Sequence, residues 1–171
     1  MVTVQLDVAY FGAAEILPGI LAWVREGMAQ RGDPEWAAEH IYEVAEDACP
    51  GQELADAGRC MDVDKAWDGI SFLLRAAGGA PAPVSDEDLG YGPARCLKAG
   101  QVREAAGCLA VPPWERLAGH FDAARMRAEG ACPAIWGNEA DLDYLRHNYH
   151  DLVAFFGFAA AAGDGVILWL T

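Results

Sequence analysis

The sequence predicts an α+β fold: a mainly helical single domain over residues 1–171, with a small sheet that recruits strands from both ends of the chain. Three observations lead to this prediction. Apolar and polar residues alternate at the N-terminus, longer segments carry apolar residues at helical spacing, and a short apolar run lies near residue 170. With 171 residues, 53% of them hydrophobic, the chain is long enough for one packed core and short for two domains.

Two segments at opposite ends of the chain predict strands. Residues 2–9 alternate apolar and polar side chains, which is the period of a half-buried strand. Residues 166–170 form a continuous apolar run after a Gly-Asp-Gly turn, which is typical of a buried strand. Neither segment can satisfy its backbone hydrogen bonds alone, so we expect both to belong to one sheet. Residues 94–97 are a candidate for a further short strand.

The predicted helices are indicated by apolar residues three or four positions apart. They cover about residues 17–32, 35–48, 64–77, 99–109, 113–129 and 139–161. Asp33-Pro34-Glu35 is a start signal, because a carboxylate at the N-cap precedes a proline in the first turn. The segments 50–60 and 80–93 are predicted to be irregular connections, and the second is rich in proline and glycine.

Composition excludes several classes of protein. There are 26 acidic residues against 12 basic ones, which gives a formal net charge of -14. A surface so negative repels phosphate backbones and anionic lipids, so we expect neither nucleic acid nor a membrane as partner. Apolar segments are too short to span a bilayer, and the first ten residues lack the basic start of a signal peptide. Five scattered cysteines favour free thiols and a cytoplasmic location, with a Cys49–Cys60 disulfide left possible.

One polar cluster lies at residues 61–69, where Asp62, Asp64, Lys65 and Asp68 surround Trp67. The spacing does not fit an EF-hand calcium loop, because the fifth, sixth and twelfth positions counted from Asp62 are Ala, Trp and Leu. The structural interpretation is that Asp62 or Asp64 caps the helix at 64–77. The functional interpretation is that Asp64, Lys65 and Asp68 face a cleft.

A second polar cluster lies at residues 87–95, where Tyr91 sits between two glycines and Arg95 follows Gly92-Pro93-Ala94. The glycine spacing fits neither a dinucleotide fingerprint nor a P-loop. An arginine after a stiff turn can hold a carboxylate with two hydrogen bonds. We therefore predict that the two clusters meet in space, with Arg95 paired to an acidic side chain. The candidate polar site consists of Asp62, Asp64, Lys65, Asp68, Tyr91 and Arg95.

Motifs for a metal, a cofactor or a nucleophile are lacking. His147 and His150 could share one helix face, but no third ligand is spaced to join them, and H-E-x-x-H is absent. Neither serine of the chain lies in G-x-S-x-G, and no Cys-x-x-Cys pair occurs. We therefore expect no metal and no cofactor.

Both clusters, in this order, resemble the bacterial YfbM-like family, a domain of unknown function (DUF1877). The matching residues are Asp62–Ile70 with Phe72–Leu74, Glu87–Arg95, Phe121-Asp122, Met126, Pro133 and Trp136. The resemblance implies a single α+β domain and brings no established activity. Two positions depart from the family pattern: Ser71, where members often have His, and Lys98, where they have Thr or Ser.

Two functional hypotheses follow. The first is a binding module for a protein or a small ligand, since negative charge and six tryptophans suit recognition of a basic partner. The alternative is a small hydrolase that uses Asp64, Asp68 and Arg95 in a cleft, so whether the chain is an enzyme is left open. Trp67 and Trp136 are both predicted to be largely buried core residues.

Overall fold

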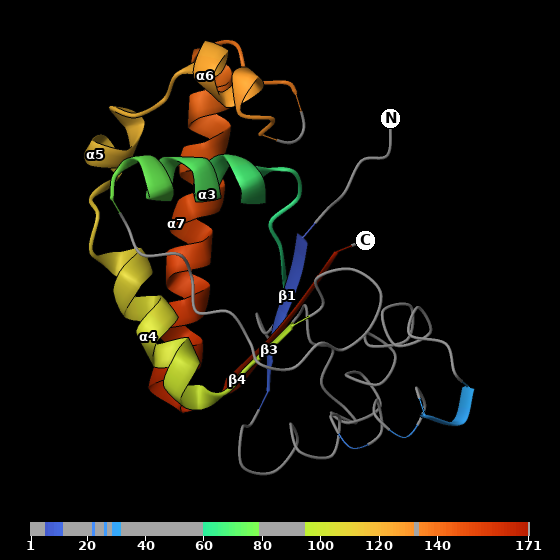
Figure 1. The fold of residues 1–171 in the computed structure, drawn as a ribbon. Helices are drawn as coiled ribbons and strands as arrows, with labels where there is room; N and C mark the ends of the chain where they lie inside the picture. The colour runs from blue at the N-terminus through green and yellow to red at the C-terminus, as the bar shows by residue number, and fades with distance from the viewer. Residues whose placement is uncertain are drawn as a thin grey trace.

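The elements of the fold are those of a computed structural model that describes residues 6–11, 22, 26, 29–31, 60–78, 95–131 and 134–170. In chain order they are β1 (Leu6–Phe11), β2 (Cys60–Asp62), α3 (Ala66–Ala76), β3 (Arg95–Leu97), α4 (Ala99–Ala110), α5 (Trp114–Ala118), α6 (Ala123–Ala128), α7 (Glu139–Ala162) and β4 (Gly165–Leu170). The fold is α+β and mainly helical, as predicted (Figure 1).

The described strands form one sheet in the order β2-β1-β4-β3, and every neighbouring pair is antiparallel. Its centre is the pairing of β1 with β4, which runs without a break from Leu6 opposite Leu170 to Phe11 opposite Gly165. The prediction that strands from both ends share a sheet is therefore confirmed. The short strand at Arg95–Leu97 is also confirmed, whereas β2 lies where the sequence predicted a connection and a helix cap.

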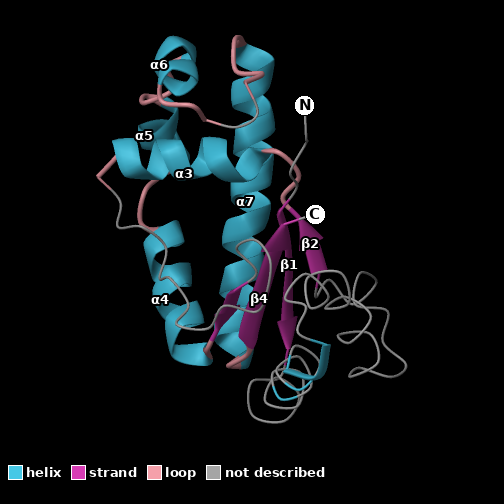
Figure 2. Cartoon of the chain, turned by 45° about the vertical axis from the view of Figure 1, so that its right-hand side comes forward, coloured by secondary structure: helices cyan, strands magenta, loops and turns pink. Residues whose placement is uncertain are grey.

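The helices α3 to α7 lie together on one side of the sheet, with α7 nearest to it (Figure 2). α7 begins where the sequence predicted, because Asn138 and Asp141 form a capping box: the Asn138 side chain accepts from the Ala140 N–H at 2.8 Å, and the Asp141 carboxylate accepts from the Asn138 N–H at 2.9 Å. α7 ends at Gly163, whose φ of 74° is the left-handed conformation that glycine tolerates best.

The core of the described residues includes the place where α3 crosses α7 (Figure 1). Trp136, just before α7, is 1% exposed, and its indole N–H donates to the carbonyl of Ala131 at 3.2 Å. The prediction of a buried Trp136 is confirmed. The prediction for Trp67 is only partly right, because this residue packs against the core but remains half-buried.

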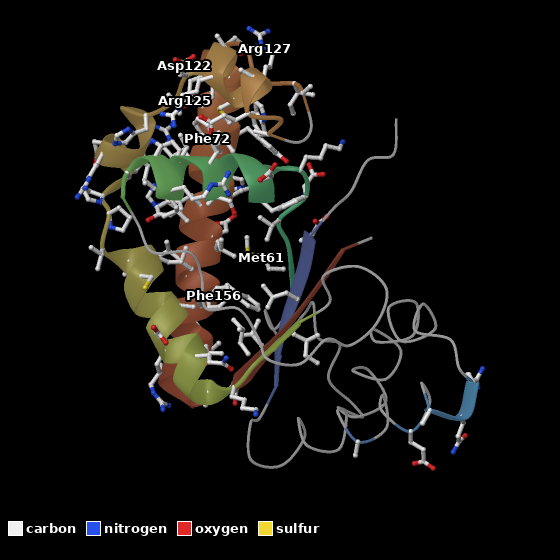
Figure 3. The ribbon with its side chains drawn as sticks, in the orientation of Figure 1. Met61, Phe72, Asp122, Arg125, Arg127 and Phe156 are labelled. Atoms are coloured by element: carbon white, nitrogen blue, oxygen red, sulfur yellow. The ribbon has the colours of Figure 1, made fainter. Side chains whose placement is uncertain are left out.

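The predicted helix at 113–129 is wrong in one respect, since the structure has two short helices, α5 and α6, with a turn between them. Asp122 causes the break. Its backbone is extended and its carboxylate accepts hydrogen bonds from the N–H groups of Ala124 and Arg125, both at 3.0 Å. An N-cap of this kind starts a new helix instead of continuing the previous one. The turn brings the Arg125 guanidinium to 5.3 Å from the ring centre of Phe72 on α3 (Figure 3).

Some predictions can be followed only in part. Ala22, Glu26 and residues 29–31 are helical, in agreement with a helix over 17–32, and the Gln30 side chain donates to the Glu26 carboxylate at 2.9 Å. The predicted helix at 35–48 and the predicted connection at 80–93 lie outside the described residues.

Candidate functional site at the junction of β2 and α3

The chain turns from β2 into α3 within three residues. The Asp62 Oδ1 accepts a hydrogen bond from the Asp64 N–H at 2.6 Å, and the Ala66 N–H donates to the Val63 carbonyl at 3.1 Å. Asp64 itself has a φ of 46°, in the left-handed region that aspartate tolerates better than most residues. The local sequence Asp-Val-Asp therefore encodes a tight turn that orients two carboxylates.

The predicted capping role of Asp62 or Asp64 is wrong. Lys65 occupies the N-cap position of α3, and its own side chain makes no capping hydrogen bond there. The Asp62 carboxylate instead accepts a hydrogen bond from the N–H of Asp64, one residue before this N-cap. Because Asp64 has a left-handed backbone, the helix starts later than the sequence pattern suggested.

Tyr144 on α7 connects this turn to the rest of the fold. Its hydroxyl donates to Asp64 Oδ2 at 2.7 Å and accepts from the Lys65 N–H at 3.0 Å. Burial, together with the hydrogen bond to Asp64, raises the pKa of Tyr144 well above its ordinary value of about 10. The hydroxyl therefore stays protonated at neutral pH, and its donor and acceptor functions are both engaged. It holds Asp64 in place and is a poor candidate for a proton acceptor.

Sequence analysis missed Tyr144 because it lies 80 residues from Asp64. One weak signal was present. The apolar stripe of the predicted helix at 139–161 runs through Leu142, Leu145 and Tyr149, and Tyr144 lies off that stripe. A polar-tipped aromatic residue beside a core stripe commonly finds a hydrogen-bond partner when it is buried. The sequence alone could not identify Asp64 as that partner.

Four of the six residues in the predicted site lie on the segment that runs from β2 into the first turn of α3. We define the β2–α3 corner as Asp62, Asp64, Lys65, Asp68 and Tyr144. Asp62 is exposed, while the other four residues are half-buried. Met61, which precedes the corner, lies between the sheet and α7 (Figure 3).

Arg95 is the remaining predicted site residue that lies on a described strand. Its backbone belongs to β3, at the opposite edge of the described sheet from β2. One row of the sheet runs from Met61 through Val8 and Leu168 to Arg95. Three strand spacings of about 4.8 Å put the two edge strands roughly 14 Å apart. The sheet topology therefore does not support a pairing of Arg95 with Asp62. Its predicted pairing with Asp64 or Asp68 stays a prediction, because the Arg95 side chain and Tyr91 lie outside what the structure describes.

The described residues contain no group of three or more His, Cys, Asp or Glu side chains arranged to hold a metal ion. His147 lies 3.3 Å from the Asp151 carboxylate on the exposed side of α7, and Cys108 is a free thiol. Across the same part of the chain, no helix is both long and apolar enough to cross a membrane. The corner thus offers fixed carboxylate oxygens and a bound hydroxyl as its chemistry.

Comparison with known proteins places the chain in a family. The profile described as "Domain of unknown function (DUF1877)" matches residues 26–169. The chain belongs to this family. The crystal structure of YfbM, a protein of unknown function from Escherichia coli, is similar to this DUF1877 chain with a TM-score of 0.65 and 15% identity, over 98% of this chain and 99% of YfbM. At that identity the likeness concerns the fold alone. A comparison with curated proteins found no match.

Proposed function

We propose that this DUF1877 protein is a binding module that recognises a basic protein, and that the β2–α3 corner contributes carboxylates to the contact. The observation that carries the proposal is the way the corner is held. Asp64 is fixed by the Tyr144 hydroxyl, and the Asp62 carboxylate is fixed on the Asp64 N–H. Oriented carboxylates bind ammonium and guanidinium groups with less loss of side-chain entropy than mobile ones.

The backbone of Asp64 supports the same proposal. A non-glycine residue in the left-handed region persists where the surroundings hold it there, and such residues gather at binding sites. Here the holding contact comes from a separate element, α7, through Tyr144. A turn that had only to connect β2 with α3 could use glycine at this position without strain.

The charge distribution along the sequence supports a basic partner. Residues 33–56 contain eight acidic residues and no lysine or arginine, although the chain has 12 basic residues in all. Like charges gathered in one segment repel one another, and a basic protein relieves this repulsion on binding. Charge of this kind also speeds the encounter of two proteins at low ionic strength. A cytoplasmic location fits this proposal, since the odd set of five cysteines favours free thiols.

The hydrolase alternative has less support. That hypothesis placed Arg95 in one cleft with Asp64 and Asp68. The backbone of Arg95 belongs to β3, at the edge of the sheet opposite β2. Tyr144, a further polar group at the corner, has a raised pKa, and its hydroxyl already donates one hydrogen bond and accepts another. We therefore carry only the binding module forward.

Affinity capture from the native cell tests the proposed function. The bait is compared as the wild-type chain and as a doubly neutralised variant, Asp62→Asn with Asp68→Asn. Asparagine at position 62 retains a side-chain oxygen that can accept from the Asp64 N–H, so the turn is preserved while the charge is removed. We expect a basic protein that wild type enriches and the variant loses by about tenfold, with binding that weakens as salt increases.

The matched control is Asp143→Asn, which removes one exposed carboxylate on α7 that faces Arg146 at 3.0 Å. The control should capture the same basic protein as the wild type. If no basic protein depends on the corner, or if Asp143→Asn loses the partner equally, the proposed function is wrong. The second result would mean that total charge, and not the corner, determines binding.

A further inference from the structure

We draw no further inference here: the strongest candidate, the exposed arginine patch on α3, α5 and α6, supports no proposal, because Arg116 and Arg125 are held within the fold by the Ala77 carbonyl and the Glu129 carboxylate, and nothing in the structure shows what covers Arg75 and Arg127.

Discussion

α3 meets α7 in two different ways along its length. Near its N-terminus the contact is polar, since the Tyr144 hydroxyl bonds to Asp64 and to the Lys65 N–H. One turn further along α3 the contact is apolar and very close. A Cβ built on Gly69 would lie 2.7 Å from Leu145 Cδ2 and 2.9 Å from the Trp136 ring. The comparison teaches that the apolar contact determines how near the helices lie, whereas the polar contact orients the turn that precedes α3.

The largest expected effect comes from breaking the apolar contact with Gly69→Ala. A methyl group at this position overlaps the rigid Trp136 ring, which is 1% exposed and has no room to move. Overpacking costs typically about 1–3 kcal/mol, and contacts below 3.0 Å with buried side chains belong to the upper part of that range, about 2–3 kcal/mol. The gain in helix propensity of about 1 kcal/mol offsets only part of this cost. We expect the free energy of unfolding, measured by urea denaturation, to fall by about 1–2 kcal/mol.

Gly107→Ala is the matched control for this prediction. Gly107 lies inside α4, and a Cβ there would meet nothing within 4 Å. The same substitution should therefore raise stability by about 0.5–1 kcal/mol, because alanine is the better helix former. If both substitutions stabilise the protein, the close contact between α3 and α7 is not as described.

The elements that carry the apolar contacts of the fold could largely be predicted from the sequence. A strand at each end of the chain and the α7 helix follow from local patterns of two or of three to four residues, and the burial of Trp136 follows from its place at a junction between predicted helices. The break between α5 and α6 could also have been anticipated, since Asp122 is a strong N-cap residue. β2 could not, because three residues are too few to show a period and its pairing with β1 is a long-range contact.

For the polar contact, the sequence indicates which residues are polar but not which of them pair. The density of acidic residues at 61–69 marks the corner, but the capping role assigned to Asp62 or Asp64 assumed a helix start that the left-handed Asp64 shifts. The expected partner was Arg95, chosen because basic residues are few. The partner that the structure shows for Asp64 is Tyr144, which only the packing of α7 against the turn selects, while the pairing of Arg95 stays a prediction because its side chain is not described. Local pattern reveals which residues are polar, whereas tertiary packing decides which of them meet.

A smaller effect is expected from breaking the polar contact with Tyr144→Phe. The variant keeps the ring and removes the hydroxyl, so Asp64 Oδ2 and the Lys65 N–H each lose one hydrogen bond. Because the group is half-buried, water replaces part of what is lost, and we expect a decrease of about 1 kcal/mol in the free energy of unfolding. A double-mutant cycle with Asp64→Ala measures the coupling. Strictly additive effects would show that the contact contributes nothing to stability.

The smallest expected effect is a pH dependence of stability that separates the two contacts. Only the polar contact contains a titratable group, the Tyr144 hydroxyl. The pKa of Tyr144 is raised in the folded protein, whereas in the unfolded chain it is about 10. The neutral hydroxyl therefore contributes its full stabilisation below pH 10. Above pH 10 the unfolded chain loses this proton first, so the contribution decreases as the pH rises towards the folded-state pKa. Burial raises the pKa of Tyr149 in the same direction, and that residue is present in both proteins that are compared.

Urea denaturation of wild type and Tyr144→Phe between pH 8 and pH 11 tests this prediction. Wild type should lose stability more steeply than the variant over the alkaline part of that range, so the gap between the two curves narrows as the pH increases. The contributions of Tyr149 and of the lysines cancel in the difference, which isolates Tyr144. Two curves that stay parallel up to pH 11 would mean that Tyr144 ionises equally in the folded and unfolded states. The bond to Asp64 would then not hold the proton, and the corner would lack the fixed carboxylate on which the proposed function depends.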